Sequence, residues 1–270
     1  MNKSLPVPLP QAQRVAKSLA DTTNYDPDIK ETGALDLAKI IVDEKVEEAT
    51  EKRICTAFIE HLRNENTQVR ATAVRCINNV ASRISDSNLT MILTKLSEET
   101  INPTKEANKD SSAVHATDKE MSEMYALAIE NIFETTHESA KEEVQENIIK
   151  SLGANMLKGI ETKPEHVKIA CLSICTRLFK VFGQLILRSA TALINKDQFM
   201  KAIIEQMTKG TSMNLKKKAS QCMGAYSQVL NTAQLTSLVT QLLTTINASK
   251  SKAEIIIQMS CLSEMSKYLR

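Results

Sequence analysis

A helical phrase recurs six times along this chain, at intervals of about 40 to 50 residues. In its clearest copies, which begin at Val69 and Leu215, a large apolar residue is followed by a base, then by a small residue at +4, Cys at +7 and an apolar residue at +8. A third copy begins at Val167, and weaker ones begin at Ile29, Met121 and Glu254. Positions 0, +4, +7, +8 and +11 share one face of an α-helix, so each copy predicts a helix that buries this face.

Each phrase is preceded by another amphipathic segment, and the two together define one repeat. Such pairs predict an all-α HEAT-repeat α-solenoid, a right-handed superhelix of about six antiparallel helix pairs. The six Gly and six Pro are few for 270 residues and argue against an all-β fold. We expect residues 1–270 to form a single stack with repeats at 11–43, 45–85, 88–137, 140–183, 187–230 and 233–270.

Two stretches depart from the regular spacing. Residues 98–119 contain Pro103 and several charges, and we expect them to form a polar loop inserted between the two helices of the third repeat. Residues 185–197 are expected to add about two helical turns before Phe199.

Composition narrows the partners and the setting. The chain has 34 basic and 32 acidic residues, and the two signs are well mixed along it. The overall charge of +2 therefore does not indicate nucleic-acid binding. The six Cys lie within the helical phrases, and we find no apolar run that predicts a signal peptide or a membrane span. We therefore expect a reducing intracellular setting, cytoplasmic and nuclear, with no membrane and no nucleic acid as partner.

The cysteines raise the question of a metal site. Cys171 and Cys175 are four residues apart on one predicted helix, so both could face a metal, but structural zinc takes four ligands and the other Cys lie in other repeats. We favour Cys as a small hydrophobic residue at a crowded helix contact, here and at Cys76, Cys222 and Cys261. No Gly-rich phosphate loop, GxSxG or HExxH motif is present. The chain is not expected to be an enzyme or to have catalytic, cofactor-binding or metal-binding residues.

Basic residues are the candidates for partner binding. The residue after the first anchor of the phrase is basic in four repeats, at Lys30, Arg70, Lys168 and Lys216. Such a row could face an acidic partner, or its members could bridge carbonyls and carboxylates between adjacent repeats, which we favour. The run 216–218 could be a nuclear-localisation or nucleic-acid patch, but it spreads around its helix without aromatic residues, so a solvated or partner-contacting edge is favoured. The candidate partner-binding residues are Arg70, Arg75, Lys168, Lys216 and Lys217.

The last predicted helix has an apolar face, and the sequence shows no polar helix after it that would cover this face. Solenoids normally need such a cap for solubility. We therefore expect Met259, Leu262 and Met265 to form a stacking face that another polypeptide completes.

The order of the phrases also resembles one family. The segments TQVR at 67–70, AVRC at 73–76 and VASRI at 80–84 closely resemble the second repeat of the CAND family, the cullin-associated exchange factors. Residues 51–64, with DIK at 28–30, look like the first repeat of that family, and 215–230, 234–246 and 261–262 are similar to its fifth and sixth repeats. The resemblance extends from about residue 12 to residue 269, as many weak matches.

This resemblance implies a function. Family members clamp a cullin–RING scaffold and exchange its substrate-receptor modules, and this chain matches the arm that grips the C-terminal region of the cullin with its RING subunit and opposes neddylation. Family proteins are several times longer, so the resemblance also implies a second chain that carries the C-terminal repeats. The alternative is a different HEAT-repeat scaffold, such as an arm of a nuclear-transport receptor or a subunit of a phosphatase or chromosome complex.

Overall fold

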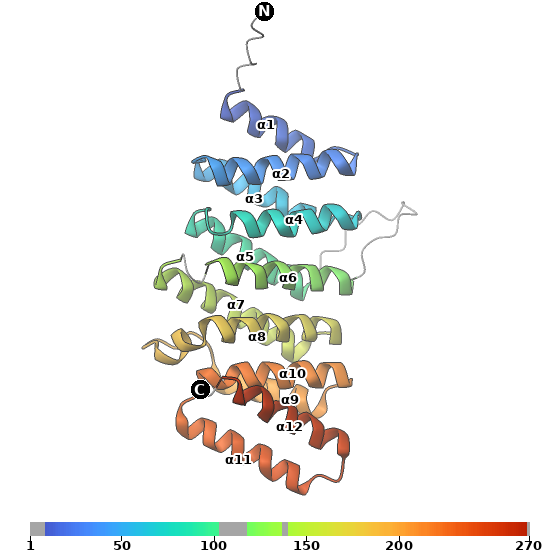
Figure 1. The fold of residues 1–270 in the computed structure, drawn as a ribbon, viewed down its shortest axis with the longest axis vertical. Helices are drawn as coiled ribbons and strands as arrows, with labels where there is room; N and C mark the ends of the chain where they lie inside the picture. The colour runs from blue at the N-terminus through green and yellow to red at the C-terminus, as the bar shows by residue number, and fades with distance from the viewer. Residues whose placement is uncertain (1–8, 103–117, 137–139, 269–270) are drawn as a thin grey trace, which may run out of the picture. The chain divides into compact units, whose positions relative to one another are not determined.

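The computed structural model describes residues 9–102, 118–136 and 140–268. Within these ranges the chain forms 12 α-helices and one 3-10 turn, without a β-strand, which confirms the all-α helical-repeat fold. The helices run in pairs, and the second helix of each pair carries the recurring phrase (Figure 1). Their bounds are α1 Gln11–Thr22, α2 Pro27–Asp43, α3 Glu48–His61, α4 Thr67–Val80, α5 Asp86–Ile101, α6 Asp118–Thr136, α7 Glu142–Thr162, α8 Glu165–Arg188, α9 Lys196–Lys209, α10 Met213–Tyr226, α11 Thr232–Ala248 and α12 Lys252–Ser266, with the 3-10 turn η1 at Ser227–Val229.

The helices belong to two compact units. Of the described residues, the first unit comprises 9–92, and the second comprises 93–102, 118–136 and 140–268. The expected single stack over 1–270 and its right-handed superhelix stay predictions.

In the first unit, α2 packs on α1 and on α4. Both second helices start at an N-cap that the sequence supplies: the Asp26 side chain accepts a hydrogen bond from the backbone N–H of Asp28, and the Asn66 side chain accepts from those of Gln68 and Val69. The phrase in α4 is buried as its spacing predicts, because Val69, Ala73, Cys76 and Ile77 are all 0% exposed.

In the second unit, the second helices lie side by side in the order α6, α8, α10, α12, and the first helices α7 and α9 pack on them (Figure 1). The phrase in α10 is again buried, with Leu215, Ala219, Cys222 and Met223 inside. Aromatic edges join neighbouring helices: the Phe179 ring on α8 meets those of Phe199 and Tyr226 at centroid distances of 5.7 and 5.0 Å. The core of this unit therefore runs continuously from one pair to the next.

The two irregular stretches differ from their predictions. Helix α5 extends to Ile101 and α6 begins at Asp118, so the ends of the predicted 98–119 loop are helical, and its middle lies outside the described residues. Residues 185–188 continue α8, and 189–195 form an irregular segment before α9. The expected two helical turns before Phe199 are therefore wrong. The Asn195 side chain caps α9 by accepting a hydrogen bond from the Gln198 N–H. This cap sets the start of α9, which the apolar pattern alone does not specify.

Among the described residues, one helix is long and apolar enough to resemble a membrane span, although no span is expected from the sequence. Helix α8 has 24 residues and contains an 18-residue window with a mean hydropathy of 1.5. However, 61% of that window is buried, and α8 lies between α6, α7 and α10. Its composition is that of a core helix covered by neighbours on several sides.

Candidate protein-binding surfaces

Arg70, one of the candidate partner-binding residues, is buried. Only 5% of its surface is exposed, and its guanidinium donates to the carbonyl oxygens of Asn64 and Glu65 at 2.8 and 2.9 Å and to Thr67 Oγ1 at 3.1 Å. These contacts hold the α3–α4 turn against the first turn of α4. The side chain therefore serves the structure of its own turn and offers little surface to a partner.

Arg75, five residues further along α4, is exposed. Its Nη2 donates to Thr72 Oγ1 at 2.9 Å, and the Thr72 hydroxyl donates to Glu31 Oε2 at 2.7 Å. Because Glu31 belongs to α2, this chain of hydrogen bonds ties the two second helices of the first unit together. The arginine is accessible to solvent beside this link.

The candidate lysines of the second unit divide between bridging adjacent helix pairs and facing solvent, where a partner could bind. Lys168 on α8 is half-buried, and its Nζ donates to Gln206 Oε1 on α9 at 3.3 Å. Lys216 is half-buried on α10, and Lys217 beside it is exposed. Lys168 therefore bridges two helix pairs, whereas Lys217 faces solvent.

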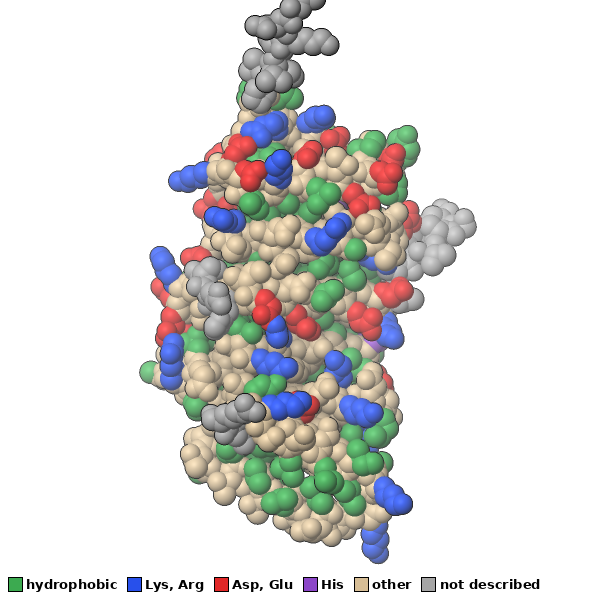
Figure 2. All heavy atoms as spheres, viewed as in Figure 1, with side chains coloured by type: hydrophobic (Ala, Val, Ile, Leu, Met, Phe, Trp, Pro, Cys, Tyr) green, Lys and Arg blue, Asp and Glu red, His purple; other side chains and the backbone are tan. Residues whose placement is uncertain are grey.

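A second basic group lies beside these lysines. We call Arg177 and Lys180 of α8 and Lys218 of α10 the basic cluster, because all three cations act on the half-buried carboxylate of Glu130 on α6. Figure 2 shows basic side chains gathered over α8 and α10, next to acidic side chains over α6. Burial raises the pKa of Glu130, and the charges of Lys218, Arg177 and Lys180 and a hydrogen bond from Ser173 lower it only in part.

Sequence reasoning missed this cluster because its members come from three helices. The row of bases found from the sequence lies at the position after the first anchor of each phrase, whereas Arg177 and Lys180 lie at +10 and +13 from Val167. The available signal was the paired spacing of Glu130 with Glu134 on one predicted helix and of Arg177 with Lys180 on the next, each three or four residues apart and so on one face.

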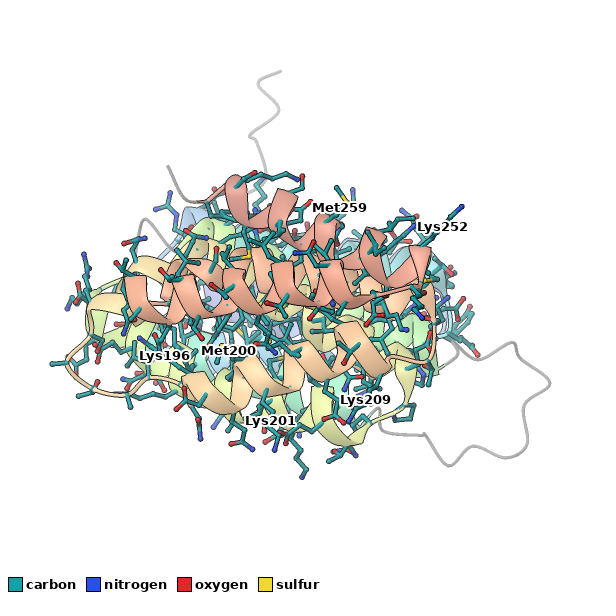
Figure 3. The ribbon with its side chains drawn as sticks, turned by 90° about the horizontal axis from the view of Figure 1, so that it is seen from below. Lys196, Met200, Lys201, Lys209, Lys252 and Met259 are labelled. Atoms are coloured by element: carbon teal, nitrogen blue, oxygen red, sulfur yellow. The ribbon has the colours of Figure 1, made fainter. Side chains whose placement is uncertain are left out.

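The end of the second unit carries an uncharged helix. Helix α11 has 17 residues without a charged side chain, and the hydroxyls of Thr236, Thr240 and Thr244 donate back to the carbonyls four residues earlier at 2.8 to 2.9 Å. Leu243 is 47% exposed. Seen from this end (Figure 3), the labelled lysines lie on α9 and α12, around α11. We call the exposed side of α11 the end face.

The three residues of the predicted stacking face differ in exposure. Met259 is 58% exposed and lies on the side of α12 away from α9 (Figure 3). Leu262 is half-buried, and Met265 is 1% exposed within the packed interior. Met265 therefore contributes to the core, and Ile256, at 56% exposed, is a further exposed apolar side chain of α12.

The cysteines pack as apolar residues. All six are free and buried, and burial raises the pKa of the Cys76, Cys171, Cys222 and Cys261 thiols to about 12. Among the described residues, no group of three or more His, Cys, Asp or Glu side chains could hold a metal ion. The thiols therefore stay protonated at neutral pH and fill space between helices.

A hollow lies beside the irregular 189–195 segment. It has a volume of about 840 Å³ and is lined by α7, by this segment and by the start of α9. Leu193 and Ile194 turn inward to fill the gap between the helices, at 4% and 7% exposed. Polar side chains such as those of Lys150 and Lys196 line it as well.

Comparison with known proteins supports the fold. No family model matches the chain, and no curated protein matches it. Among solved structures, it is similar to Kap121p bound to Nup53p, with 13% identity over 95% of this chain and 25% of that chain and a TM-score of 0.63. It is also similar to Kap121p bound to RanGTP, with 14% identity over 95% of this chain and 26% of that one and a TM-score of 0.62. The chain thus spans about a quarter of a karyopherin of the same helical-solenoid fold, and membership of the CAND family stays a prediction.

Proposed function

We propose that this chain is a protein-binding scaffold, without catalytic activity, that docks partners on the exposed sides of its second helices. The observation that carries the proposal is the accessible basic surface of α10, where Lys216 and Lys217 stand beside the basic cluster. Basic groups on successive helices of a repeat protein form an extended surface that suits an acidic partner. We expect the chain to act in the cytoplasm and nucleus.

The partner that we propose is the C-terminal region of a cullin with its RING subunit. This follows from the resemblance of the repeats to the CAND family, and it implies that attachment of the ubiquitin-like modifier to the cullin opposes binding. Through this contact the chain would regulate the assembly of cullin–RING ubiquitin ligases.

A titration of the purified chain against modified and unmodified cullin–RING complex tests this function. We expect tighter binding of the unmodified complex, and weaker binding at higher salt because rim charges act mainly on the association rate. Changing Lys216 and Lys217 to Glu should weaken binding about tenfold or more, since opposite charges become like charges. The matched control is the same exchange at Lys201 and Lys209, two exposed lysines on α9 (Figure 3).

The outcomes separate the competing functions. Equal affinity for both cullin forms would remove the link to neddylation. No measurable affinity for either form would contradict the cullin proposal and favour another HEAT-repeat scaffold. Among these the arm of a nuclear-transport receptor has the support of a shared fold with Kap121p, whose solved structures contain Nup53p and RanGTP.

We also propose that a second chain carrying further repeats stacks on the end face. An exposed helix without charge, whose threonine hydroxyls are satisfied by its own backbone, presents methyl groups that another helix can cover without losing hydrogen bonds to water. Leu243 supplies a larger apolar contact.

Changing Leu243 and Thr240 to Glu is expected to abolish this association, because stacking would then bury two unpaired charges. Sedimentation velocity with a chain bearing later repeats measures the complex, and the change of Glu143 and Gln145 on α7 to Lys provides a control away from α11. If the native chain showed neither self-association nor binding to the second chain, the stacking proposal would be wrong.

A further inference from the structure

One position of the recurring phrase is exposed in α12 and buried in the other second helices. The residue five positions after the first anchor is buried in the first five copies, as Ala34, Val74, Ala126, Leu172 and Ser220. In α12 the same position is Met259, which is 58% exposed. Helix α12 therefore presents to solvent a side that the phrase buries elsewhere.

On α10 this position is covered by α12. The two helices pack together, and Ser220 Oγ donates to the backbone carbonyl of Ile257 at 3.3 Å. One turn further on, a Cβ added at Gly224 would clash with the Glu264 side chain, so the two helices approach closely there. The cover on α10 is thus the second helix of the following pair, which runs in the same direction.

The exposed side of α12 is apolar. Ile255, Ile256, Met259 and Leu262 lie within about one third of the helix circumference, and we call them the open side. Ile256 and Met259 are more than half exposed, and the other two are half-buried. The position of Ile256 in the phrase is occupied by Lys217 in α10, so an apolar side chain replaces an exposed charge here.

Basic residues border the open side. Lys252 lies one turn before Ile256, and it projects with Met259 from the side of α12 away from α9 (Figure 3). Lys217 lies one turn before Ser220 on α10 and therefore beside the first turns of α12. Figure 2 shows hydrophobic side chains gathered over α11 and α12, with basic side chains at the edges of this area.

This end of the second unit is also positively charged as a whole. Residues 210–268 contain six lysines and two glutamates, a net charge of +4, whereas the entire chain has +2. Glu254 accepts a hydrogen bond from a neighbouring serine and Glu264 pairs with a neighbouring lysine, while Lys217 and Lys252 are exposed. An acidic ligand is therefore favoured here, and a basic one is repelled.

We propose that the open side of α12 is the docking site of an acidic amphipathic helix of a partner protein. The helix lies along α12 as α12 lies along α10, with its apolar residues on Ile256 and Met259 and its carboxylates towards Lys217 and Lys252. The inference rests on the proposed scaffold function and deepens it by naming a site and the chemistry of a partner.

A partner helix fits this surface better than a membrane or a second copy of the chain. Helix α12 has no aromatic residue, and only Ile256 and Met259 could enter a bilayer, because its opposite side is held in the core. A second copy would bring the same excess of lysine to the contact. Methionine is flexible and adapts to the side chains of a partner helix.

The test measures binding of a labelled helical peptide, with Leu along one side and Glu on the others, to the full chain by fluorescence anisotropy. The comparison ligands are the same peptide with Lys in place of Glu and vesicles of phosphatidylserine and phosphatidylcholine. Met259→Glu should weaken binding of the acidic peptide about tenfold or more, because the contact would then bury an unpaired carboxylate. Lys252→Glu should weaken it about fivefold and should tighten binding of the basic peptide, since the sign of the charge at the rim is reversed.

Matched controls are available in the same unit. Leu127→Glu places the same carboxylate at an exposed apolar position of α6, and Lys201→Glu reverses an exposed charge on α9. Neither control should change the affinity by more than about twofold. Urea unfolding of every variant shows whether the fold is kept, and Ile256→Glu repeats the test at a second exposed position should Met259→Glu unfold the chain.

Weaker binding by folded Met259→Glu, together with opposite effects of Lys252→Glu on the two peptides, supports the proposal. Native affinity of either variant for the acidic peptide would overturn it. So would equal binding of the two peptides, binding to the vesicles in preference to the peptide, or a dimer in sedimentation that Met259→Glu dissociates. The cullin titration and the changes on the end face are separate measurements, so those proposals can fail while this one stands, and the reverse.

Discussion

Replacing Cys222 by Asp should lower the free energy of unfolding by about 4 kcal/mol, the largest change that we expect from a single substitution in this chain. Cys222 is 0% exposed on α10. Even the native thiol is held protonated there, since burial raises its pKa to about 12. A carboxylate in its place must either stay charged without a partner or take up a proton and leave a polar group buried, and both states destabilise the fold.

Urea unfolding followed by circular dichroism at 222 nm measures this effect, with the wavelength chosen for the α-helical signal of the chain. The control is Gln221→Asp, which introduces the same carboxylate one residue earlier, at an exposed position of the same helix. It should change the stability by less than about 1 kcal/mol. Equal stability of the two variants would contradict the burial of the phrase, and with it the stacking of α10 on its neighbours.

Replacing Arg70 by Met should lower the free energy of unfolding by about 3 kcal/mol, although a charged residue at this position suggests a surface residue in the sequence. Met retains much of the apolar stem but removes the guanidinium, which makes three hydrogen bonds within the α3–α4 turn. The carbonyl oxygens of Asn64 and Glu65 then lose a charged donor.

The control for this change is Arg75→Met on the same helix. Arg75 is exposed and donates a hydrogen bond to the Thr72 hydroxyl, so its loss should lower the free energy of unfolding by less than about 1 kcal/mol. Thermal and urea unfolding give the two stabilities. If both variants were equally stable, the interpretation of Arg70 as a residue of the turn would be wrong, and a role in partner binding would regain support.

Equivalent positions in the repeats do not share one function, as Arg70 and Lys168 illustrate. Arg70 and Lys168 follow the same anchor of the phrase, yet the arginine fork reaches two carbonyls of its own turn while the lysine reaches Gln206 on the next first helix. A planar guanidinium can serve several acceptors at fixed angles, whereas an ammonium group acts as a point charge. Partner binding must therefore be assigned residue by residue, from exposure and contacts.

Sequence alone was sufficient for the helix pairs and for the buried side of the phrase. Apolar residues at 0, +4, +7 and +8 have few ways to leave water other than on one face of a helix, and Val69, Cys76, Leu215 and Cys222 are buried as that spacing requires. The N-caps at Asp26 and Asn66 are equally local, since these side chains accept hydrogen bonds from backbone N–H groups two or three residues ahead. Local geometry fixes such features within about one turn of helix.

Tertiary structure alone decided the course of 189–195, the packing around α8 and the membership of the basic cluster. Leu193 and Ile194 leave helical geometry because their side chains can be buried in the gap between α7 and α9. Local helix propensity does not predict this departure. The charges of Arg177, Lys180 and Lys218 act on the pKa of Glu130 only because α6 packs on α8 and α8 packs on α10. Periodicity specifies which side of a helix is buried. Which helices cover that side is set by the joint packing of several helices, and only this packing brings charged side chains of different helices close together.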